Sequence, residues 1–263
     1  MLEFDFSGKV AVLTGAASGM GFLTAKSFVR MGGSVVMADL NAEALERTVA
    51  EVNEIREGAA VGVVCDVRDY AQIVAVKDRA MEAFGRIDLA VPYAGGAELR
   101  MLNVRGLEFP DVPIEVYDWS IDVNLRAQLY LAHAVLGVMR EQRSGVIITV
   151  GSVTGEEGSN NNVGYATTKS GAMEGLTKSL AQYGAKYGVR CCCVSPGPVL
   201  TRAAMANMDT LLGRAAEPEE VVGFVLYLAS EEGAILTGHN YFVDGGRTVM
   251  PQKTWTKRVE DKK

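Results

Sequence analysis

VAVLTGAASGMG, residues 10–21, joins a short apolar run to a glycine-rich turn. The apolar run predicts a strand, and the residues from Gly19 to Met31 follow the period of a helix. In such a turn, backbone N–H groups can approach a pyrophosphate, and the positive end of the helix macrodipole favours the same negative charge. We expect Gly15 to make the tight turn, Gly19 to allow the close approach, and Gly21 to let the helix pack on the strand.

Strand-like runs and helical periods alternate along the rest of the chain. Strands are predicted at 10–14, 34–38, 60–65, 89–93, 146–150, 189–194 and 241–243, and helices at 19–31, 41–57, 69–85, 113–143, 165–187 and from Pro218 onward. This alternation predicts a Rossmann-like α/β fold, a doubly wound parallel sheet with helices on both faces. No repeat or linker interrupts residues 1–246, which are predicted to form one domain, whereas residues 247–263 are predicted to form a basic C-terminal tail.

Composition narrows the class of function. The 263 residues carry a formal charge of −6, which argues against nucleic acid or a membrane surface as the partner. The acidic start lacks the regions of a secretory signal, and no apolar run reaches the roughly 18–20 residues of a membrane span. Cys65 and the triplet Cys191-Cys192-Cys193 are expected to be buried thiols of a cytoplasmic protein. With only His133 and His239 as imidazoles, no metal site is expected.

An acidic residue closes the second predicted strand. Asp39 lies 18 residues beyond Gly21 (39 − 21), close to the spacing typical of an acid that binds the ribose hydroxyls of a dinucleotide. A carboxylate there repels a 2′-phosphate by about 4 kcal/mol at about 4 Å and an effective dielectric of about 20. No Arg or Lys lies in the glycine-rich turn or at Leu40, so NAD rather than NADP is predicted as the cofactor. Asp66 and Val67, after the third strand, are expected to contact the adenine.

A phenol and an ammonium stand four residues apart on a predicted helix, at Tyr165 and Lys169, so they share one face. A free phenol has a pKa of about 10, and work as a base near neutral pH requires the pKa to fall by about 2–3. One fixed cation about 4–5 Å away supplies an energy of that order. Ser152 follows the fifth strand, where α/β sheets place their sites, and its hydroxyl can hold a substrate oxygen.

As a set, these motifs resemble the short-chain dehydrogenase/reductase family over essentially residues 8–246. The matching positions are Thr14 to Gly21, Asp39, Asp66-Val67, Ala94-Gly95, Asn124, Ser152, Tyr165, Lys169, Pro196-Gly197, Val199, Thr201 and Val243-Asp244-Gly245-Gly246. The resemblance implies a seven-stranded parallel sheet of order 3-2-1-4-5-6-7 and a homotetramer. It implies cofactor contacts from Gly15, Ser18, Gly19, Met20, Gly21, Asp39, Leu40, Asp66, Val67, Ala94, Gly95, Tyr165, Lys169, Pro196, Gly197, Val199 and Thr201.

The same resemblance implies roles for four catalytic residues. Tyr165 is the acid/base on the substrate oxygen, and Lys169 lowers the pKa of this phenol and binds the nicotinamide ribose. Ser152 positions the substrate, and Asn124 holds a water that links Lys169 to solvent. The implied reaction is reversible hydride transfer between a secondary alcohol carbon and nicotinamide C4, with the proton moved by Tyr165.

Three stretches depart from the family pattern. Pro92-Tyr93 stands where the family commonly has Asn-Asn, and the cysteine triplet replaces the usual Asn of the sixth strand. Each change removes hydrogen bonds that normally brace the cofactor loops. The stretch from Thr201 to Glu217 is short for a substrate lid, whereas the loop from Gly96 to Pro113 is long and carries Arg100 and Arg105.

The leading hypothesis is an NAD-dependent dehydrogenase of a small secondary alcohol. Two alternatives share its chemistry: an NADPH-dependent ketoreductase of acyl-carrier thioesters, against which Asp39 counts, and a steroid or cyclic-alcohol dehydrogenase. A nucleotide sensor or scaffold is an alternative of another class, which the intact catalytic positions disfavour. Polar side chains favour a sugar or polyol as substrate, and apolar lid residues favour a steroid or ring ketone. The polar set is Glu156, Glu157, Asn160 and Asn162, and the apolar set is Met205, Met208, Leu211 and Leu212.

Overall fold

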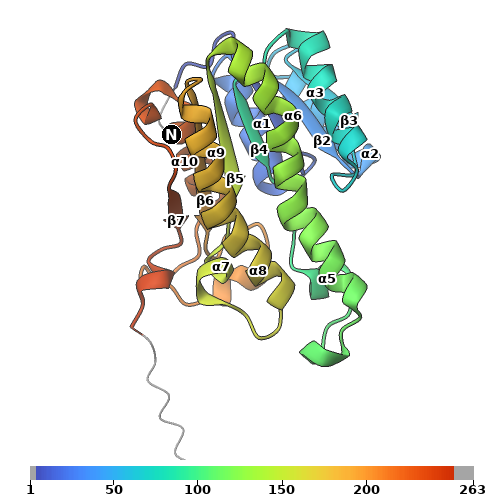
Figure 1. Ribbon diagram of the computed structural model, residues 1–263, viewed down its shortest axis with the longest axis vertical. Helices are drawn as coiled ribbons and strands as arrows, with labels where there is room; N and C mark the ends of the chain where they lie inside the picture. Colours follow the sequence, from blue (N-terminus) through green and yellow to red (C-terminus); the bar gives the residue numbers. More distant parts are fainter. Residues whose placement is uncertain (1–3, 252–263) are drawn as a thin grey trace, which may run out of the picture.

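The computed structural model describes residues 4–251 and contains one seven-stranded sheet (Figure 1). The strands are β1 (Val10–Thr14), β2 (Ser34–Asp39), β3 (Ala60–Val64), β4 (Leu89–Pro92), β5 (Gly145–Val150), β6 (Val189–Pro196) and β7 (Asn240–Val243). All neighbours are parallel, and the order is β3-β2-β1-β4-β5-β6-β7, which confirms the predicted fold and its single domain. The strand order changes direction between β1 and β4, and in open α/β sheets ligands bind outside the carboxyl ends of the strands at this point.

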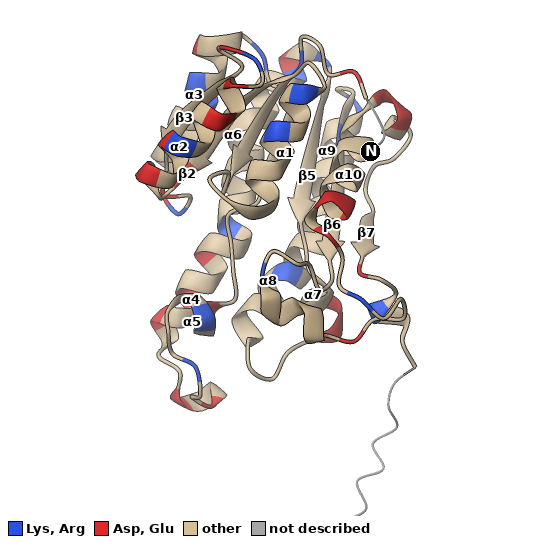
Figure 2. Cartoon of the chain, turned by 180° about the vertical axis from the view of Figure 1, so that it is seen from behind, with Lys and Arg blue, Asp and Glu red and all other residues tan. Residues whose placement is uncertain are grey.

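Helices cover both faces of the sheet and enclose two apolar cores. One face is covered by α1 (Gly19–Arg30), α2 (Ala42–Asn53) and α10 (Pro218–Ala229), which bury Phe28, Leu45 and Leu226 against β1, β2 and β5. The other face is covered by α3 (Tyr70–Phe84), α6 (Ala127–Gln142) and α9 (Thr177–Ala185), seen in front in Figure 1. Figure 2, which views the molecule from the opposite side, shows α1 and α10. Burial on both faces explains why the strands are almost continuously apolar.

Local contacts and backbone conformation set several helix ends. Asn41 accepts a hydrogen bond from Ala44 N (3.0 Å) and begins α2, and Gly85 ends α3 in the left-handed conformation. The helix expected to reach Glu57 ends at Asn53 instead. Its side chain donates to Ala60 O (3.0 Å) and accepts from Ala60 N (2.9 Å), so it turns the chain into β3.

The two longest predicted helices are each interrupted by one turn of π-helix. The helix expected at 113–143 consists of α5 (Ile114–Ile121), a π turn η2 (Asp122–Arg126) and α6. The helix expected at 165–187 begins earlier and consists of α8 (Val163–Gly171), a π turn η3 (Ala172–Leu176) and α9. Apolar periodicity alone does not reveal such a turn, and π turns are frequent at functional sites. Short elements complete the fold: α4 (Glu98–Met101), η1 (Phe109–Asp111), α7 (Val153–Glu157), η4 (Ala203–Asn207), η5 (Glu231–Gly233) and η6 (Arg247–Val249).

The predicted tail begins inside the described part of the chain. Its first residue, Arg247, forms an ion pair with Glu157 of α7 (Nε to Oε1, 2.8 Å), and residues 252–263 lie outside the described residues. All four cysteines are buried free thiols, and burial raises the pKa of Cys65 to about 12. Within residues 4–251 no helix combines the length and hydropathy needed to cross a bilayer, and no group of three or more ligating side chains could hold a metal ion.

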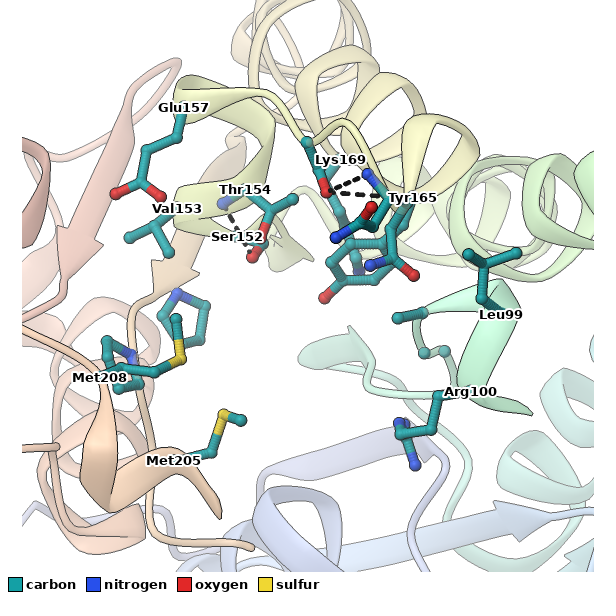
Figure 3. Close-up of a pocket in the computed structure, with 18 of the residues that line it drawn as sticks. Leu99, Arg100, Ser152, Val153, Thr154, Glu157, Tyr165, Lys169, Met205 and Met208 are labelled. Atoms are coloured by element: carbon teal, nitrogen blue, oxygen red, sulfur yellow. Dashed lines mark hydrogen bonds between the residues drawn. The ribbon is translucent and has the colours of Figure 1, made fainter. Parts of the chain in front are cut away.

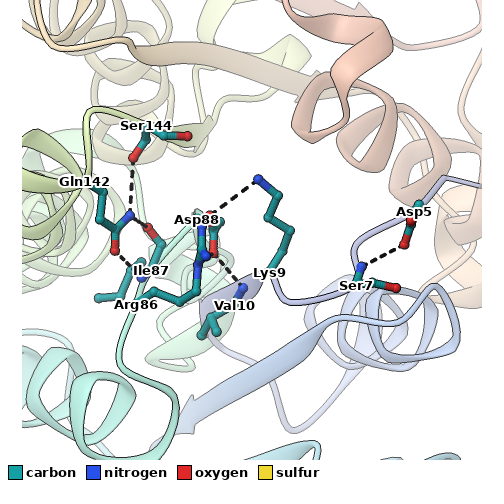
Figure 4. Close-up of polar contacts among 9 residues, drawn as sticks. All are labelled: Asp5, Ser7, Lys9, Val10, Arg86, Ile87, Asp88, Gln142 and Ser144. Carbon is teal, nitrogen blue, oxygen red and sulfur yellow. Dashed lines mark hydrogen bonds and ion pairs between the residues drawn. The ribbon is translucent and has the colours of Figure 1, made fainter.

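A buried carboxylate joins β1 to β4 at the end of the sheet remote from the site (Figure 4). Asp88 accepts hydrogen bonds from Val10 N (2.9 Å) and from Arg86 Nε and Nη2 (2.7 and 2.6 Å), and Lys9 Nζ lies 3.8 Å away. Next to it, Gln142 of α6 donates to Ile87 O (2.7 Å) and accepts from Ile87 N (2.9 Å). These contacts fix the start of β4 against β1 and α6.

We expect Asp88→Ala to lower the free energy of unfolding by about 3 kcal/mol, because it leaves a buried N–H and a guanidinium without their acceptor. Urea unfolding measures the change. The control Glu82→Ala removes an exposed carboxylate paired with Arg79 on α3 (2.6 Å), and is expected to change stability by less than about 0.5 kcal/mol. Equal effects of the two substitutions would contradict the role given to Asp88.

Candidate active site

A cleft of about 1250 Å³ lies at the carboxyl end of the sheet. Its walls come from the segments that follow three strands: Gly95–Ala97 after β4, Gly151–Thr154 after β5 and Gly197–Val199 after β6. Tyr165 and Lys169 of α8 also line it. In Figure 3 Ser152, Tyr165 and Lys169 lie on one wall, opposite Met205 and Met208. The cleft therefore lies where the strand order predicts a site.

The glycine-rich turn leaves no room for a side chain at Gly15 or at Gly21. Gly15 has φ +64°, and a Cβ there would lie 2.6 Å from Ala94 N. A Cβ at Gly21 would collide with Gly15 O, so the start of α1 sits directly on the turn. Ser18, the N-cap of α1, is exposed and its side chain makes no capping hydrogen bond. Bare backbone and an uncommitted hydroxyl at a helix N-terminus fit the pyrophosphate of the predicted dinucleotide.

The two acids expected to bind the adenosine differ in their surroundings. Asp39 Oδ2 accepts from Ala17 N of the turn (3.0 Å) and Oδ1 accepts from Asn41 N (3.0 Å), so the carboxylate is fixed beside the turn. Leu40 next to it is 66% exposed. Asp66 instead binds the Arg68 guanidinium through both oxygens (2.6–3.1 Å), and this hydrogen-bonded partner lowers the pKa of Asp66. The carboxylate oxygens of Asp66 thus already have a cationic partner.

Lys169 is buried at the centre of the site. Its side chain is 4% exposed, and Nζ donates to Val150 O at the end of β5 (2.9 Å). Nζ lies 5.5 Å from the centre of the Tyr165 ring, which confirms that spacing by four residues puts the two groups on one face. Burial lowers the pKa of Lys169 from its usual 10.5 to about 8. The ammonium is therefore charged at neutral pH, at an energetic cost.

Tyr165 faces the cleft, and burial raises the pKa of its phenol. The Ser152 side chain and the positive charges of Arg202 and Arg100 lower the pKa against this effect. Ser152 precedes α7, Arg202 precedes η4 and Arg100 lies on α4, so these groups come from three separate segments. The lowering of this pKa by Lys169 stays a prediction. Ser152 is buried at the start of α7, where Oγ accepts from Thr154 N (3.2 Å).

Asn124 sits in the π turn η2, fully buried. Its side chain accepts from Gly96 N (2.9 Å) and donates to Gly96 O (3.0 Å), so it fixes the chain leaving β4. A Cβ at Gly95 would lie 2.7 Å from Asn124 Oδ1 and 3.8 Å from Lys169 Nζ, which places both residues at this glycine.

Gln128, one turn further on, donates to Asn124 O (2.7 Å) and to Val150 O (3.0 Å), and accepts from Val150 N (2.9 Å). Val150 O therefore accepts hydrogen bonds from both Gln128 and Lys169. The sequence offered no signal for Gln128, because its partners are backbone atoms of a distant strand.

Glu98 of α4 is a second residue that the motifs do not predict. It is completely buried, and its Oε2 accepts from Tyr165 N (3.0 Å) and from Ser120 Oγ (3.2 Å). A carboxylate at this N–H satisfies one of the free donors in the first turn of α8 and favours the helix dipole. The long loop after β4 thereby holds the helix that carries Tyr165.

The remaining predicted cofactor contacts gather at the same edge. The cleft is lined by Met20, Gly95, Pro196, Gly197, Val199 and Thr201, and Thr201 lies across from Gly19. Ala94 packs on Gly15, and Val67 is buried after β3.

At two of the positions that depart from the family pattern, the residues present make hydrogen bonds of their own. Tyr93 donates to or accepts from Thr24 Oγ1 (2.8 Å), and Cys192 Sγ donates to Leu236 O (3.3 Å).

Only some of the candidate substrate contacts reach the cleft. Glu157, Asn160 and Asn162 line it, and so do Met205 and Met208. Glu156, Leu211 and Leu212 are exposed and lie outside its lining. The lining is therefore mixed, with amides and charges on one side and thioethers on the other.

Comparison with known proteins agrees with this geometry. A family model described as "Enoyl-(Acyl carrier protein) reductase" matches residues 15–248. The chain is 31% identical to 7alpha-hydroxysteroid dehydrogenase of Bacteroides fragilis, over 93% of this chain and 96% of the relative. It is 33% identical to D-threitol dehydrogenase of Mycolicibacterium smegmatis, over 94% of this chain and 96% of the relative.

A solved structure from Brucella melitensis, described as a short-chain dehydrogenase/reductase of the glucose/ribitol dehydrogenase type, superposes with a TM-score of 0.82. The two chains are 28% identical, and the match covers 93% of this chain and 98% of that one. Extent, topology and site thus agree: this chain belongs to the short-chain dehydrogenase/reductase family and is an oxidoreductase that acts on hydroxyl and keto groups.

Proposed function

We propose that this protein interconverts a secondary alcohol and a ketone with NAD(H), and that Tyr165 is its acid/base. The observation that carries the proposal is the position of Tyr165 and Ser152 in one cleft, beside the buried ammonium of Lys169. When bound, the nicotinamide accepts or supplies the hydride. The protein's own groups then have to hold the substrate oxygen and move one proton.

In the oxidation direction, Tyr165 takes the hydroxyl proton of the substrate while Ser152 keeps a hydrogen bond to the same oxygen. In the reduction direction the phenol returns a proton to the carbonyl oxygen. Because burial raises the pKa of Tyr165, the protein favours the protonated phenol, and cations beside it are needed to reach the phenolate. Lys169 supplies such a charge and, as the resemblance implies, also binds the nicotinamide ribose. The water relay through Asn124 is part of this proposal.

The preference for NAD rests on the fixed carboxylate of Asp39. Its hydrogen bond to Ala17 holds the charge beside the glycine-rich turn, and the adjacent Leu40 offers no cation to a 2′-phosphate. Arg68, the nearby guanidinium of the next loop, is engaged with Asp66. These contacts support NAD and count against an NADPH-linked ketoreductase of acyl-carrier thioesters.

We propose a small hydroxylated substrate of the sugar or polyol type. The amides of Asn160 and Asn162 line the cleft and offer both donors and acceptors. A steroid or cyclic alcohol is the second candidate, favoured by Met205 and Met208 on the opposite wall. We also propose a cytoplasmic homotetramer. Exposed apolar side chains on α5, α6 and α9 (Ile121, Leu129, Tyr183) support assembly, which sedimentation equilibrium measures.

Tyr165→Phe is expected to lower kcat by about a thousandfold or more, because the substrate oxygen loses its proton partner. NADH binding, followed by fluorescence, is expected to stay within about twofold. Tyr70→Phe, which changes a partly exposed tyrosine of α3 outside the cleft lining, serves as the control and is expected to retain full activity. Turnover by Tyr165→Phe near the unmodified rate would disprove the assignment.

The ratio of kcat/KM for NAD over NADP is expected to exceed about one hundred, since the Asp39 carboxylate repels the 2′-phosphate. Asp39→Ala is expected to bring this ratio down by at least about tenfold, whereas Glu46→Ala, on the exposed side of α2, leaves it unchanged. The assay is reduction of each cofactor at 340 nm with the best alcohol of a polyol, sugar and steroid panel. A ratio near one in the unmodified protein would refute the NAD assignment.

Lys169→Met is expected to stabilise the protein by about 3 kcal/mol at pH 7, although it abolishes activity. The unfolded chain holds the Lys169 proton up to its usual pKa of 10.5, whereas the folded chain releases it near pH 8, so the charged form costs stability below pH 8. Between pH 8 and 10.5 this cost fades, and so does the gain from Lys169→Met. Val150 O keeps its hydrogen bond from Gln128 in the variant.

Urea unfolding at pH 7 and at pH 10 measures whether Lys169→Met raises the free energy of unfolding and whether the gain fades at the higher pH. Lys178→Met removes an exposed lysine of α9 that pairs with Glu174 of η3, and is expected to show no comparable pH dependence. A Lys169→Met protein less stable than the unmodified protein at pH 7 would show that the ammonium is not destabilising.

A further inference from the structure

Positive charge exceeds negative charge around the cleft. Besides Lys169, four arginines line it, namely Arg100, Arg105, Arg202 and Arg247, against the carboxylates of Glu108 and Glu157. Arg247 is paired with Glu157. Among the described residues, the other three arginines form no ion pair with a carboxylate. Three guanidinium groups without a carboxylate partner therefore remain, which we call the arginine group (Arg100, Arg105, Arg202).

Arg100 is the innermost of the three. It is half-buried, and its Nε is buried without a hydrogen-bond partner in the described part of the protein. Its guanidinium passes so close to Gly96 that a Cβ there would lie 3.0 Å from Nη2. In Figure 3 the head group projects into the cleft from α4. A buried donor left unpaired is uncommon in native proteins, and its natural partner is an acceptor from outside the chain.

The three cations also repel one another. After burial, the charges of Arg202 and Arg105 are the main causes that lower the pKa of Arg100, and no carboxylate is among the groups acting on it. Residues of three separate segments, α4, the loop that follows it and the lid before η4, thus bring like charges together. Like charges at close range destabilise a fold unless an anion joins them.

The arginine group adjoins the reacting phenol. Arg202 and Arg100 both lower the pKa of Tyr165, which places them within electrostatic reach of the phenol. Arg100, Arg202, Tyr165 and Ser152 all line the cleft, so an anionic group of the substrate can meet the two arginines while its reacting oxygen meets the two hydroxyls. Guanidinium groups bind carboxylate and phosphate oxygens in pairs, with a fixed geometry that orients the ligand.

We propose that the arginine group binds an oxyanion carried by the substrate, a carboxylate or a phosphate ester, so that the substrate is a small hydroxy or keto acid or a phosphorylated polyol. The inference rests on the proposed function, because it assumes that the substrate oxygen lies at Tyr165. It extends that proposal by adding a charged handle to the hydroxylated substrate class. The pyrophosphate of the cofactor is the competing source of the same chemistry.

A binding experiment separates these sources without requiring turnover. The full chain, alone and with NADH, is titrated calorimetrically with malonate, with inorganic phosphate and with neutral malonamide. We expect malonate or phosphate to bind, and malonamide to bind at least about tenfold more weakly. The double variant Arg100→Gln with Arg202→Gln is expected to lower the affinity for malonate or phosphate by at least about tenfold and to leave NADH affinity within about twofold. Arg100→Lys, which keeps the charge, is expected to retain part of the affinity.

Arg79→Gln is the matched control, because this arginine lies exposed on α3 and pairs with Glu82. Arg202→Gln alone changes an exposed residue and keeps the test open if the double variant folds poorly. Equal binding of malonate and malonamide, or unchanged malonate affinity in the arginine variants, would overturn the inference. So would a tenfold loss of NADH affinity in the same variants, which would assign the arginines to the cofactor phosphates.

A kinetic experiment identifies the substrate group. NAD reduction is compared for 3-hydroxybutyrate and its methyl ester, for gluconate and sorbitol, and for sorbitol 6-phosphate and sorbitol. Higher kcat/KM for at least one charged member, lost in the Arg100→Gln and Arg202→Gln variants, is the expected result, and preference for every neutral member contradicts it. Anion binding that persists while no alcohol or ketone is turned over refutes the proposed function but leaves the oxyanion site standing.

Discussion

The burial of one ammonium organises this protein. Lys169 Nζ is held at the end of β5 by Val150 O, which also receives Gln128 from the π turn side of α6. Burying a charge costs free energy, which the hydrogen bond to Val150 O offsets in part. The proposed use of the ammonium in catalysis accounts for this cost, and the surrounding residues fix the phenol, the Ser152 hydroxyl and the chain after β4 around the same point. The two apolar cores on the faces of the sheet stabilise the fold and offset the cost of burying this side chain.

Side chains from segments that are distant in the chain hold the wall of the cleft that carries Tyr165. Glu98 binds the backbone of Tyr165, Asn124 binds Gly96, and Gln128 binds the last residue of β5. Two of these three side chains lie in or directly after a π turn, where one extra residue per turn rotates them inward. The segment after β4 and the helix α8 that carries Tyr165 are thus held together. A cluster of cations from that loop and from the lid faces the phenol, and so the loop affects both shape and electrostatics of the cleft.

Sequence patterns were sufficient for the topology and for most of the site. The apolar runs before Gly15, Asp39 and Ser152 predicted strands whose ends meet at one edge, and spacing by four residues correctly placed Tyr165 beside Lys169. Sequence patterns did not predict features that depend on contacts between distant parts of the chain. The π turns leave apolar periodicity almost unchanged, α2 stops early because Asn53 binds Ala60, and Glu98 acts through a backbone N–H 67 positions away.

The bond between Glu98 and Tyr165 N has a consequence for the exchange of specificity within such proteins. A replacement segment after β4 that lacks an acceptor at this position would leave the first turn of α8 frayed, whatever pocket it built. Redesign by loop grafting therefore has to transplant the carboxylate together with the pocket-forming side chains. Natural diversification faces the same restriction, because insertions are free to grow beyond Met101 but not to displace the short helix that precedes it.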